Sequence, residues 1–155
     1  MALQWKRATA EDLPLLCETR LMVLRAANLL SEDASLPQVE AATRAYYAER
    51  LASGMHTALL VLDGERVVGA GDVSYYAVMP TVHNPDGRKA YVMNMYTSPE
   101  YRRQGVARET LRRLVEDCHR CGVWHITLEA TEAGRPLYER FGFVPMGDEM
   151  ILPEE

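Results

Sequence analysis

The spacing of the apolar residues changes at Thr57 and again at Ser98, and these changes restrict the fold more than any other feature. Before Thr57, a short strand at residues 3–7 precedes apolar residues that recur at helical spacing from Leu13 to Leu24. A second helix is expected from Pro37 to Ser53, because proline is favoured in the first turn of a helix. The first part of the chain is therefore expected to form one strand and two helices.

Three strands joined by turns are expected after these helices. They lie at residues 57–62, 67–78 and 89–97. Asp63-Gly64 is a typical two-residue hairpin turn between the first two of them. Gly69 and Gly71 lie within the second strand and predict a bulge or a close approach of another segment to the backbone. The three strands are expected to form an antiparallel meander.

From Ser98 onward the order becomes strand, helix, strand. The pattern predicts a helix ending near Gly122, a strand from Trp124 to Ala130, a short helix from Arg135 to Arg140 and a last strand from Phe143 to Leu152. A strand–helix–strand unit within one sheet implies a parallel pair with a right-handed crossover. We therefore expect a mixed α/β fold of the α+β type, with a six-stranded sheet between helices.

Length and charge exclude several classes of protein. The chain has 155 residues, which suits one domain spanning residues 1–155. Its net charge is -5, with 22 acidic and 17 basic residues, and this balance argues against general binding of nucleic acids. No apolar run reaches the length of a membrane span and residues 1–7 lack a signal-peptide core, so a cytoplasmic location without membrane contact is expected.

The three cysteines, Cys17, Cys118 and Cys121, raise the question of metal or redox chemistry. Cys118 and Cys121 have CxxC spacing, but they fall at the end of a predicted helix, whereas redox cysteines lie at a helix N-terminus. A closed zinc site would need two more ligands, and the sequence holds no second pair. We expect ordinary helix cysteines and no metal site.

Gly105 lies where a strand-to-helix turn becomes a helix. The first N–H groups of a helix have no intrahelical partners, so an anion can bind there. Gly105 and Ala107 leave room for a bulky phosphate, and Arg102, Arg103 and Arg108 supply positive charge. These residues alone describe a generic phosphate cradle, and a capped helix with a solvated basic turn is the alternative.

Two motifs in the second half of the chain together resemble one known family. Residues 102–107, Arg-Arg-Gln-Gly-Val-Ala, resemble the coenzyme A pyrophosphate loop of the GNAT superfamily of acyl-CoA-dependent N-acetyltransferases. Residues 136–143, Pro-Leu-Tyr-Glu-Arg-Phe-Gly-Phe, resemble its L-Y-x-x-x-G-F signature. The order of the expected elements also fits this family, in which the fourth and fifth strands splay apart.

The resemblance implies that this chain binds acetyl-CoA as a cosubstrate. The backbone amides from Arg103 to Arg108 would hold the pyrophosphate, and residues 95–97 would pair with the pantetheine arm as an added strand does. Thr131 stands where many relatives carry an asparagine that contacts this arm. The implied contacts are Met95, Tyr96, Thr97, Arg102, Arg103, Gln104, Gly105, Val106, Ala107, Arg108, Thr131 and Gly134.

The resemblance also implies roles for two catalytic residues. Tyr138 matches the tyrosine that donates a proton to the departing thiolate, although a tyrosine packed between the last helix and the sheet is the alternative. An amine with a pKa of about 10.4 must lose a proton before it attacks, and Glu129 corresponds to the base of some relatives. Asp72 is a second candidate base. Either carboxylate is equally compatible with a structural role.

The resemblance also implies that the site for the acceptor lies in two regions, Arg25–Leu36 and Tyr75–His83. Tyr75, Tyr76 and Met79 would form an apolar wall, and Glu32 and Asp33 would attract a cation; the alternatives are core or dimer packing and a solvated loop. The amine itself stays open among peptide N-termini, lysine side chains, polyamines, amino acids and aminoglycosides. A CoA-binding regulatory or interaction module without turnover is the alternative function, and a homodimer would fit the habit of the family.

Overall fold

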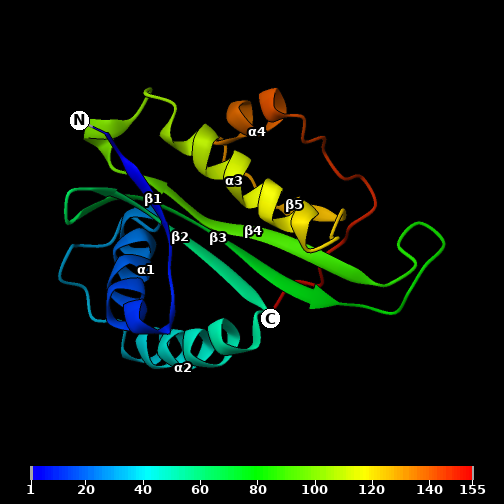
Figure 1. The fold of residues 1–155 in the computed structure, drawn as a ribbon, viewed down its shortest axis with the longest axis horizontal. Helices are drawn as coiled ribbons and strands as arrows, with labels where there is room; N and C mark the ends of the chain where they lie inside the picture. Colours follow the sequence, from blue (N-terminus) through cyan, green and yellow to red (C-terminus); the bar gives the residue numbers. More distant parts are fainter. Residues whose placement is uncertain (1, 155) are drawn as a thin grey trace.

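The computed structural model describes residues 2–154 and, within them, one five-stranded sheet with helices on both faces (Figure 1). The strands are β1 (Gln4–Arg7), β2 (His56–Asp63), β3 (Arg66–Ala77), β4 (Arg88–Thr97) and β5 (Ile126–Leu128). The helices are α1 (Leu13–Ala27), α2 (Pro37–Ser53), α3 (Val106–Arg120) and α4 (Arg135–Phe141), and 3-10 turns lie at Ala10–Asp12 and Pro99–Tyr101. Within residues 2–154, no helix is long and apolar enough to cross a membrane.

The strands follow one another across the sheet in sequence order, from β1 to β5. The first three pairs are antiparallel, whereas β4 and β5, which α3 connects, are parallel, as the sequence predicts. Their pairing covers Ala90–Val92 of β4 opposite Ile126–Leu128. Beyond Val92, β4 continues to Thr97 without β5 as a partner, so the two strands separate where the resemblance implied that they would splay.

Alternate residues of the central strands pack against different helices. Ala58 and Leu60 of β2 join the core under α1 and α2, whereas Leu59 and Val73 join the core under α3. Figure 1 shows α1 and α2 on one face of the sheet and α3 and α4 on the other. Because successive side chains of a strand alternate between faces, Asp72, between Val73 and a bulge, faces α1 and α2.

Both features predicted from the glycines of β3 are present: a bulge of β3 lies beside Gly69, and α3 approaches the backbone closely at Gly71. The register between β3 and β4 shifts between Ala70 and Asp72. A Cβ atom on Gly71 would lie 2.6 Å from the Thr110 side chain of α3, so glycine is required for the helix to pack here. Opposite Gly71 the extra residue lies in β4, where Asn94 has a φ of 57° that turns the strand locally.

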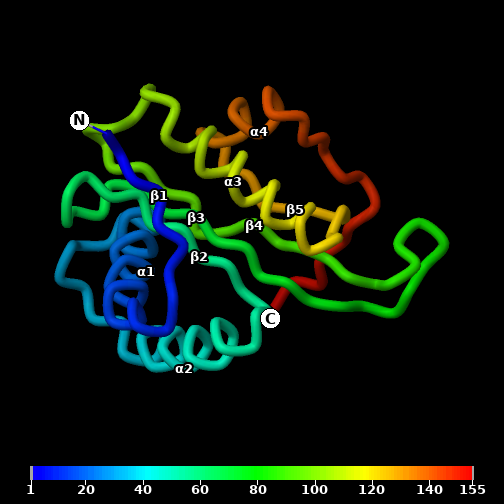
Figure 2. The backbone as a smooth tube through the Cα atoms, in the orientation of Figure 1, coloured from blue at the N-terminus to red at the C-terminus, as the bar shows by residue number. Residues whose placement is uncertain are grey.

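The C-terminal part of the prediction is wrong in two respects. Within the described residues no strand forms at 143–152, and β5 spans Ile126–Leu128 rather than Trp124–Ala130. Figure 2 shows this last segment, orange to red, leaving α4 as an irregular path. Pro145 lacks the N–H that a sheet ladder needs, Gly147 weakens a strand, and a three-residue β5 offers little edge to pair with.

Candidate active site

The loop before α3 presents a row of unpaired backbone donors. Gly105 is the N-cap of α3 with a φ of 80°, and Arg103 has a φ of 61°, so two residues turn the backbone through the left-handed region. Among residues 2–154, none of the six amides from Arg103 to Arg108 donates to another backbone group. Consecutive free amides in such a turn form a concave site for an anion.

Contacts on both sides fix the shape of this loop. The Arg102 guanidinium donates from Nε to the carbonyl of Thr97 at 3.2 Å, and the Gln104 amide donates to the carbonyl of Glu100 at 3.1 Å. Val106 is buried in a small apolar cluster at the start of α3. A Cβ atom on Gly105 would meet nothing within 4 Å, so its glycine is required for the positive φ and the space around it is open.

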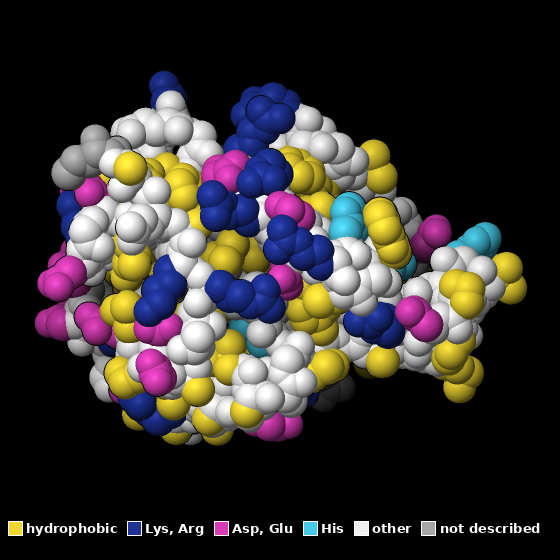
Figure 3. Space-filling model, viewed as in Figure 1, with side chains coloured by type: hydrophobic (Ala, Val, Ile, Leu, Met, Phe, Trp, Pro, Cys, Tyr) yellow, Lys and Arg dark blue, Asp and Glu magenta, His cyan; other side chains and the backbone are white. Residues whose placement is uncertain are grey.

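The arginines near this loop fall into two groups. Arg112 and Arg113 each lie 2.8 Å from the carboxylate of Glu109, whose pKa falls to about 2, chiefly because Arg112 donates hydrogen bonds to it. Figure 3 shows basic side chains interleaved with acidic ones over α3. Within the described part of the chain, Arg103 and Arg108 make no ion pair with an acidic side chain. Their charge is therefore available to an anion at the loop.

The strand that leads into the loop also has unused hydrogen-bonding groups. β4 lacks its β5 partner at residues 93–97, so the backbone of this segment is unpaired on the side facing the splay. The hydroxyl oxygen of Thr97 is buried and has no hydrogen-bond partner within residues 2–154. Buried polar atoms are nearly always paired, so this position is suited to a bound group.

A cavity of about 480 Å³ opens on the face of the sheet that α1 and α2 cover, opposite the face covered by α3. It reaches β4 at Met93 and Asn94, the first two residues of the unpaired segment. It lies between the helices α1 and α2 and the strands β2 to β4. Its lining residues are Arg20, Gln38, Val39, Ala42, Thr43, Tyr46, Tyr47, His56, Asp72, Ser74, Met93 and Asn94.

The side chain of Asp72 closes the floor of this cavity. It is 2 % exposed, and its Oδ2 atom lies 2.7 Å from the Tyr47 hydroxyl and 2.6 Å from His56 Nε2. Its Oδ1 atom accepts a hydrogen bond from the Asn94 amide at 3.0 Å. The pKa of Tyr47 is raised, mainly by its burial and next by the charge of the Asp72 carboxylate, so its hydroxyl stays protonated and donates. Both carboxylate oxygens are occupied, so Asp72 does not present a free base to the cavity.

The regions expected to hold the acceptor do not line this cavity. Tyr75 points to the α3 face, where its hydroxyl donates to Asp117 at 2.6 Å, because the alternation along β3 turns it away from Asp72. Met79 is 85 % exposed beyond the end of β3, and Glu32 and Asp33 lie in an exposed loop. The structure instead places α2 and the start of β2 at the cavity.

Comparison with known proteins identifies the family. Residues 28–151 match a family model described as an acetyltransferase (GNAT) domain. The chain belongs to the GNAT acetyltransferase family. A Bacillus subtilis (strain 168) relative, the uncharacterized N-acetyltransferase YsnE, is 35% identical over 63 residues. That match spans 37% of this chain and 42% of the relative, less than half the length of either.

Solved structures share the fold over almost the whole chain. A protein from Clostridium acetobutylicum, described as a predicted acetyltransferase with acetyl-CoA, has a TM-score of 0.88 at 25% identity, covering 98% of this chain and 96% of that one. A GCN5-related N-acetyltransferase from Ralstonia eutropha JMP134 has a TM-score of 0.80 at 24% identity, covering 99% of both chains. By family and fold this GNAT protein is an enzyme of the acyltransferase class.

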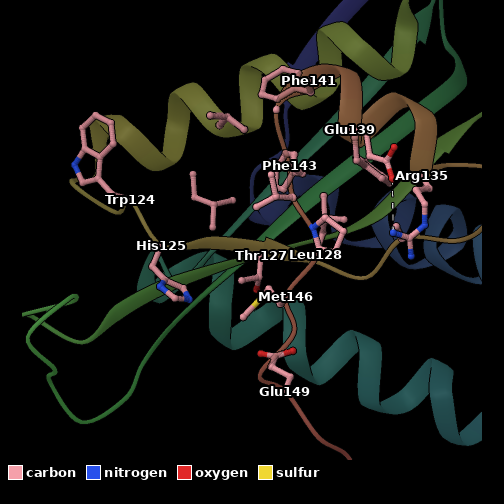
Figure 4. A pocket seen from close by; sticks show the side chains of 17 residues that line it. Trp124, His125, Thr127, Leu128, Arg135, Glu139, Phe141, Phe143, Met146 and Glu149 are labelled. Atoms are coloured by element: carbon pink, nitrogen blue, oxygen red, sulfur yellow. Dashed lines mark ion pairs between the residues drawn. The ribbon is translucent and has the colours of Figure 1, made fainter.

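Tyr138 lines a different and larger cavity of about 700 Å³ at the outer edge of β5. Figure 4 shows its walls formed by β5, α4 and the C-terminal segment, with Phe141 and Phe143 above Leu128. Tyr138 is partly buried beside Phe143, and burial raises its pKa, so the hydroxyl stays protonated. This cavity contains none of the loop residues 102–108, so we do not assign the pyrophosphate of the cosubstrate to it.

The remaining predicted site residues lie between β5 and α4. Glu129 follows β5 and is exposed. The pKa of Tyr91 on β4 is raised, first by burial of Tyr91 and second by the negative charge of Glu129. The Thr131 hydroxyl accepts a hydrogen bond from the amide of Gly134 at 3.1 Å, and its carbonyl accepts one from the amide of Arg135. Thr131 and Gly134 therefore shape the first turn of α4.

The CxxC cysteines lie at the end of α3. Cys118 is buried, and burial raises the pKa of its thiol to about 11, so it stays protonated at neutral pH. Cys121 is exposed and follows the last residue of the helix. In the part of the chain that the structure describes, no group of three or more His, Cys, Asp or Glu side chains is arranged to hold a metal ion.

Proposed function

We propose that this GNAT protein transfers the acetyl group of acetyl-CoA to a primary amine by direct attack of the amine on the thioester. One observation carries the proposal: the free amides of residues 103–108 continue into the unpaired segment 93–97 of β4, and a cavity adjoins this segment on its other face. A donor bound along the loop and strand would bring its acyl end to the cavity. The acetyl-CoA complex of the Clostridium relative supports this donor.

The cosubstrate would bind mainly through backbone groups. The amides from Arg103 to Arg108 would hold the pyrophosphate, and the side chains of Arg103 and Arg108 would add charge. The pantetheine arm would lie along residues 95–97, where the unpartnered Thr97 hydroxyl is ready to bond with it. A backbone N–H of this strand would stabilise the oxyanion that forms during attack.

Tyr138 is the proposed acid of the reaction. A hydroxyl whose pKa is raised by burial stays protonated at neutral pH and so can protonate the thiolate as the carbon–sulfur bond breaks. Tyr138→Phe should lower kcat about 100-fold and leave acetyl-CoA affinity unchanged. Unchanged turnover would remove Tyr138 from the mechanism. Glu129 stays a predicted base, and a Glu129→Gln variant with an unaltered profile of kcat/KM against pH would exclude it.

The cavity of about 480 Å³ is the proposed acceptor site. Val39, Ala42 and Met93 give it apolar walls, and Arg20 is its only cationic side chain among the described residues. Its one carboxylate, Asp72, is 2 % exposed and already accepts three hydrogen bonds, so it offers little to a second ammonium group. A small acceptor with one amine on an apolar body therefore fits better than a polycationic one.

Release of free thiol from acetyl-CoA tests the function. Purified protein is assayed with a panel of small alkylamines, amino acids, polyamines, aminoglycosides and short peptides, and acetyl-CoA binding is measured in parallel. We expect amine-dependent release that is fastest with monoamines carrying apolar groups. Binding without release with any acceptor would indicate the regulatory module instead, and failure to bind acetyl-CoA would contradict the proposal. A single domain over residues 1–155, a homodimer and a cytoplasmic location also stay predictions.

A further inference from the structure

His56 lies at the centre of a buried polar chain that neither the family motifs nor the proposed cosubstrate site uses. Its side chain is 2 % exposed. On one side its Nε2 atom lies 2.6 Å from Asp72 Oδ2, and on the other its Nδ1 atom lies 2.8 Å from the Tyr46 hydroxyl. Ser74 bridges the last two groups, 2.7 Å from the Tyr46 oxygen and 3.3 Å from Nδ1.

The partners of His56 determine which of its nitrogens carries the proton. An ionised carboxylate only accepts hydrogen bonds, so Nε2 carries hydrogen and donates to Asp72. In the neutral ring Nδ1 is then an acceptor, and the Tyr46 hydroxyl is its nearer donor. Ser74 in turn donates to the Tyr46 oxygen, whose remaining lone pair is free to accept a hydrogen from the cavity.

The end of this chain is open to the proposed acceptor. Tyr46 is only partly buried and lines the same cavity as Met93 and Asn94, beside the proposed position of the thioester. The charged and titratable groups around His56 are Tyr46 and Tyr47 on α2, Asp72 on β3, and Arg20 on α1, which reaches Asp72 through Asn94 of β4. The Arg50 guanidinium lies 5.6 Å from the centre of the Tyr46 ring.

We infer that Tyr46, His56 and Asp72 form a proton relay that removes the proton from the acceptor amine. The ammonium group passes a proton to the Tyr46 oxygen, while the hydroxyl proton of Tyr46 passes to Nδ1 of His56. The resulting imidazolium is paired with the Asp72 carboxylate. The neutral amine then forms a bond to the thioester carbon, the carbon–sulfur bond breaks, and the thiolate takes a proton from Tyr138. The nitrogen loses its second proton as the amide forms, and this proton restores the Tyr138 hydroxyl. His56 later returns its extra proton to solvent through Tyr46.

In this relay Tyr46 is the catalytic residue that touches the amine, and His56 and Asp72 act through it. Asp72 fixes the tautomer of His56 and stabilises its charged form. The inference rests on the proposed acetyl transfer. It changes the role of Asp72 from a direct base to the residue that positions His56. It also assigns a base whose side chain lies inside the acceptor cavity, unlike the exposed Glu129.

Two acceptors of different basicity separate a relay from a merely structural role. Tyr46→Phe keeps the ring and removes only the hydroxyl, and it is assayed with the fastest alkylamine of the panel and with O-methylhydroxylamine. The alkylamine is mostly protonated at pH 7 and needs a base before it can attack. O-methylhydroxylamine is mostly unprotonated at this pH and does not need one. We expect kcat/KM to fall about 100-fold for the alkylamine, to fall far less for O-methylhydroxylamine, and the defect to shrink as the pH rises. His56→Gln should show the same pattern.

The controls distinguish failure of the relay from failure of the proposed function. His119→Gln, at an exposed histidine on α3, should match the wild type with both acceptors, and all variants should keep the acetyl-CoA affinity of the wild type. Turnover by the wild type that Tyr46→Phe leaves unchanged, or lowers equally for both acceptors, would overturn the relay alone. No turnover by the wild type with any amine would overturn both proposals.

Discussion

Two buried aspartates on opposite faces of the sheet, Asp72 and Asp117, each accept several hydrogen bonds, but their surroundings differ. Asp117 on α3 accepts hydrogen bonds from the hydroxyls of Thr57 and Tyr75, at 2.7 Å and 2.6 Å, and pairs with Arg7. Burial alone would raise its pKa, but the bonds from Tyr75, Thr57 and Arg7 outweigh burial and lower it. Among residues 2–154, no arginine forms a hydrogen bond or ion pair with Asp72, and its network ends at a cavity.

The difference lies in where each network ends. The partners of Asp117 come from β1, β2 and β3, so the carboxylate connects α3 to three strands, and it lines none of the cavities described above. The network of Asp72 leads through His56 to a hydroxyl that is open to a ligand. We expect the first carboxylate to contribute mainly to stability and the second mainly to turnover.

The largest expected effect is on stability. Asp117→Ala would leave the Arg7 guanidinium and the buried hydroxyls of Thr57 and Tyr75 without their acceptor, and the two unsatisfied hydroxyls together cost about 3 kcal/mol. Chemical denaturation should show a loss of about this size in the free energy of unfolding. The activity per folded molecule should stay near that of the wild type, and a specific loss of kcat would break the comparison.

The opposite result is expected at Asp72. Asp72→Asn keeps an oxygen that can accept from His56 but removes the charge that stabilises the imidazolium, so kcat/KM for an alkylamine should fall about 100-fold. The free energy of unfolding should change by only about 1 kcal/mol, because the side chain keeps its size. Steady-state kinetics and denaturation measure both quantities. Retained turnover together with a large loss of stability would make Asp72 a second structural carboxylate.

Two glycines sharpen the same contrast between stability and function. Gly54 and Gly105 both have positive φ values, 74° and 80°, and a Cβ atom on either would meet nothing within 4 Å. Replacement of either by alanine should cost about 1 kcal/mol of stability through backbone strain. Only Gly105→Ala should also weaken acetyl-CoA binding, about 5-fold, because it disturbs the proposed pyrophosphate loop. Equal affinity in the two variants, measured by calorimetry, would contradict that role.

The smallest expected effect is a pH dependence of stability. The pKa of Asp117 is lower in the folded than in the unfolded protein, so its contribution is present above the unfolded value of about 3.9 and is lost as the pH falls through the folded value. The difference in Tm between wild type and Asp117→Ala should therefore stay constant from pH 7 to about pH 4.5 and narrow below about pH 4. A Tm difference that stays constant down to pH 3 would show that ionised Asp117 is not the cause of the Tm difference between the two proteins.

Local signals in the sequence predicted much of the fold and the proposed cosubstrate loop. Helix α2 has the predicted bounds, Pro37 to Ser53, because its proline start and its Gly54 C-cap are local features. Gly105 likewise marks the start of α3 at the predicted place. The last strand was not predictable in this way, since residues 143–152 carry a strand-like composition but no neighbour that pairs with them.

The proposed acceptor site depended on contacts that no local pattern records. His56 and Ser74 meet only because β2 and β3 pair in one register, and Tyr46 joins them only because α2 packs on that face. Asp72 was recognised as a candidate base, but its histidine partner lies 16 residues away in the sequence. The alternation along β3 sends Asp72 and Tyr75 to opposite faces, and the sequence alone did not indicate which of the two side chains faces the helices α1 and α2.

Backbone amide NMR during a titration with coenzyme A tests the central claim most directly. The claim is that the pyrophosphate and the pantetheine arm of the donor lie along residues 103–108 and 95–97, and not in the larger cavity beside β5. The account predicts the largest shift changes at the amides of residues 103–108, with further changes at 95–97. Shift changes confined to the lining of the larger cavity, such as Trp124 and Met146, with the loop amides unchanged, would contradict it.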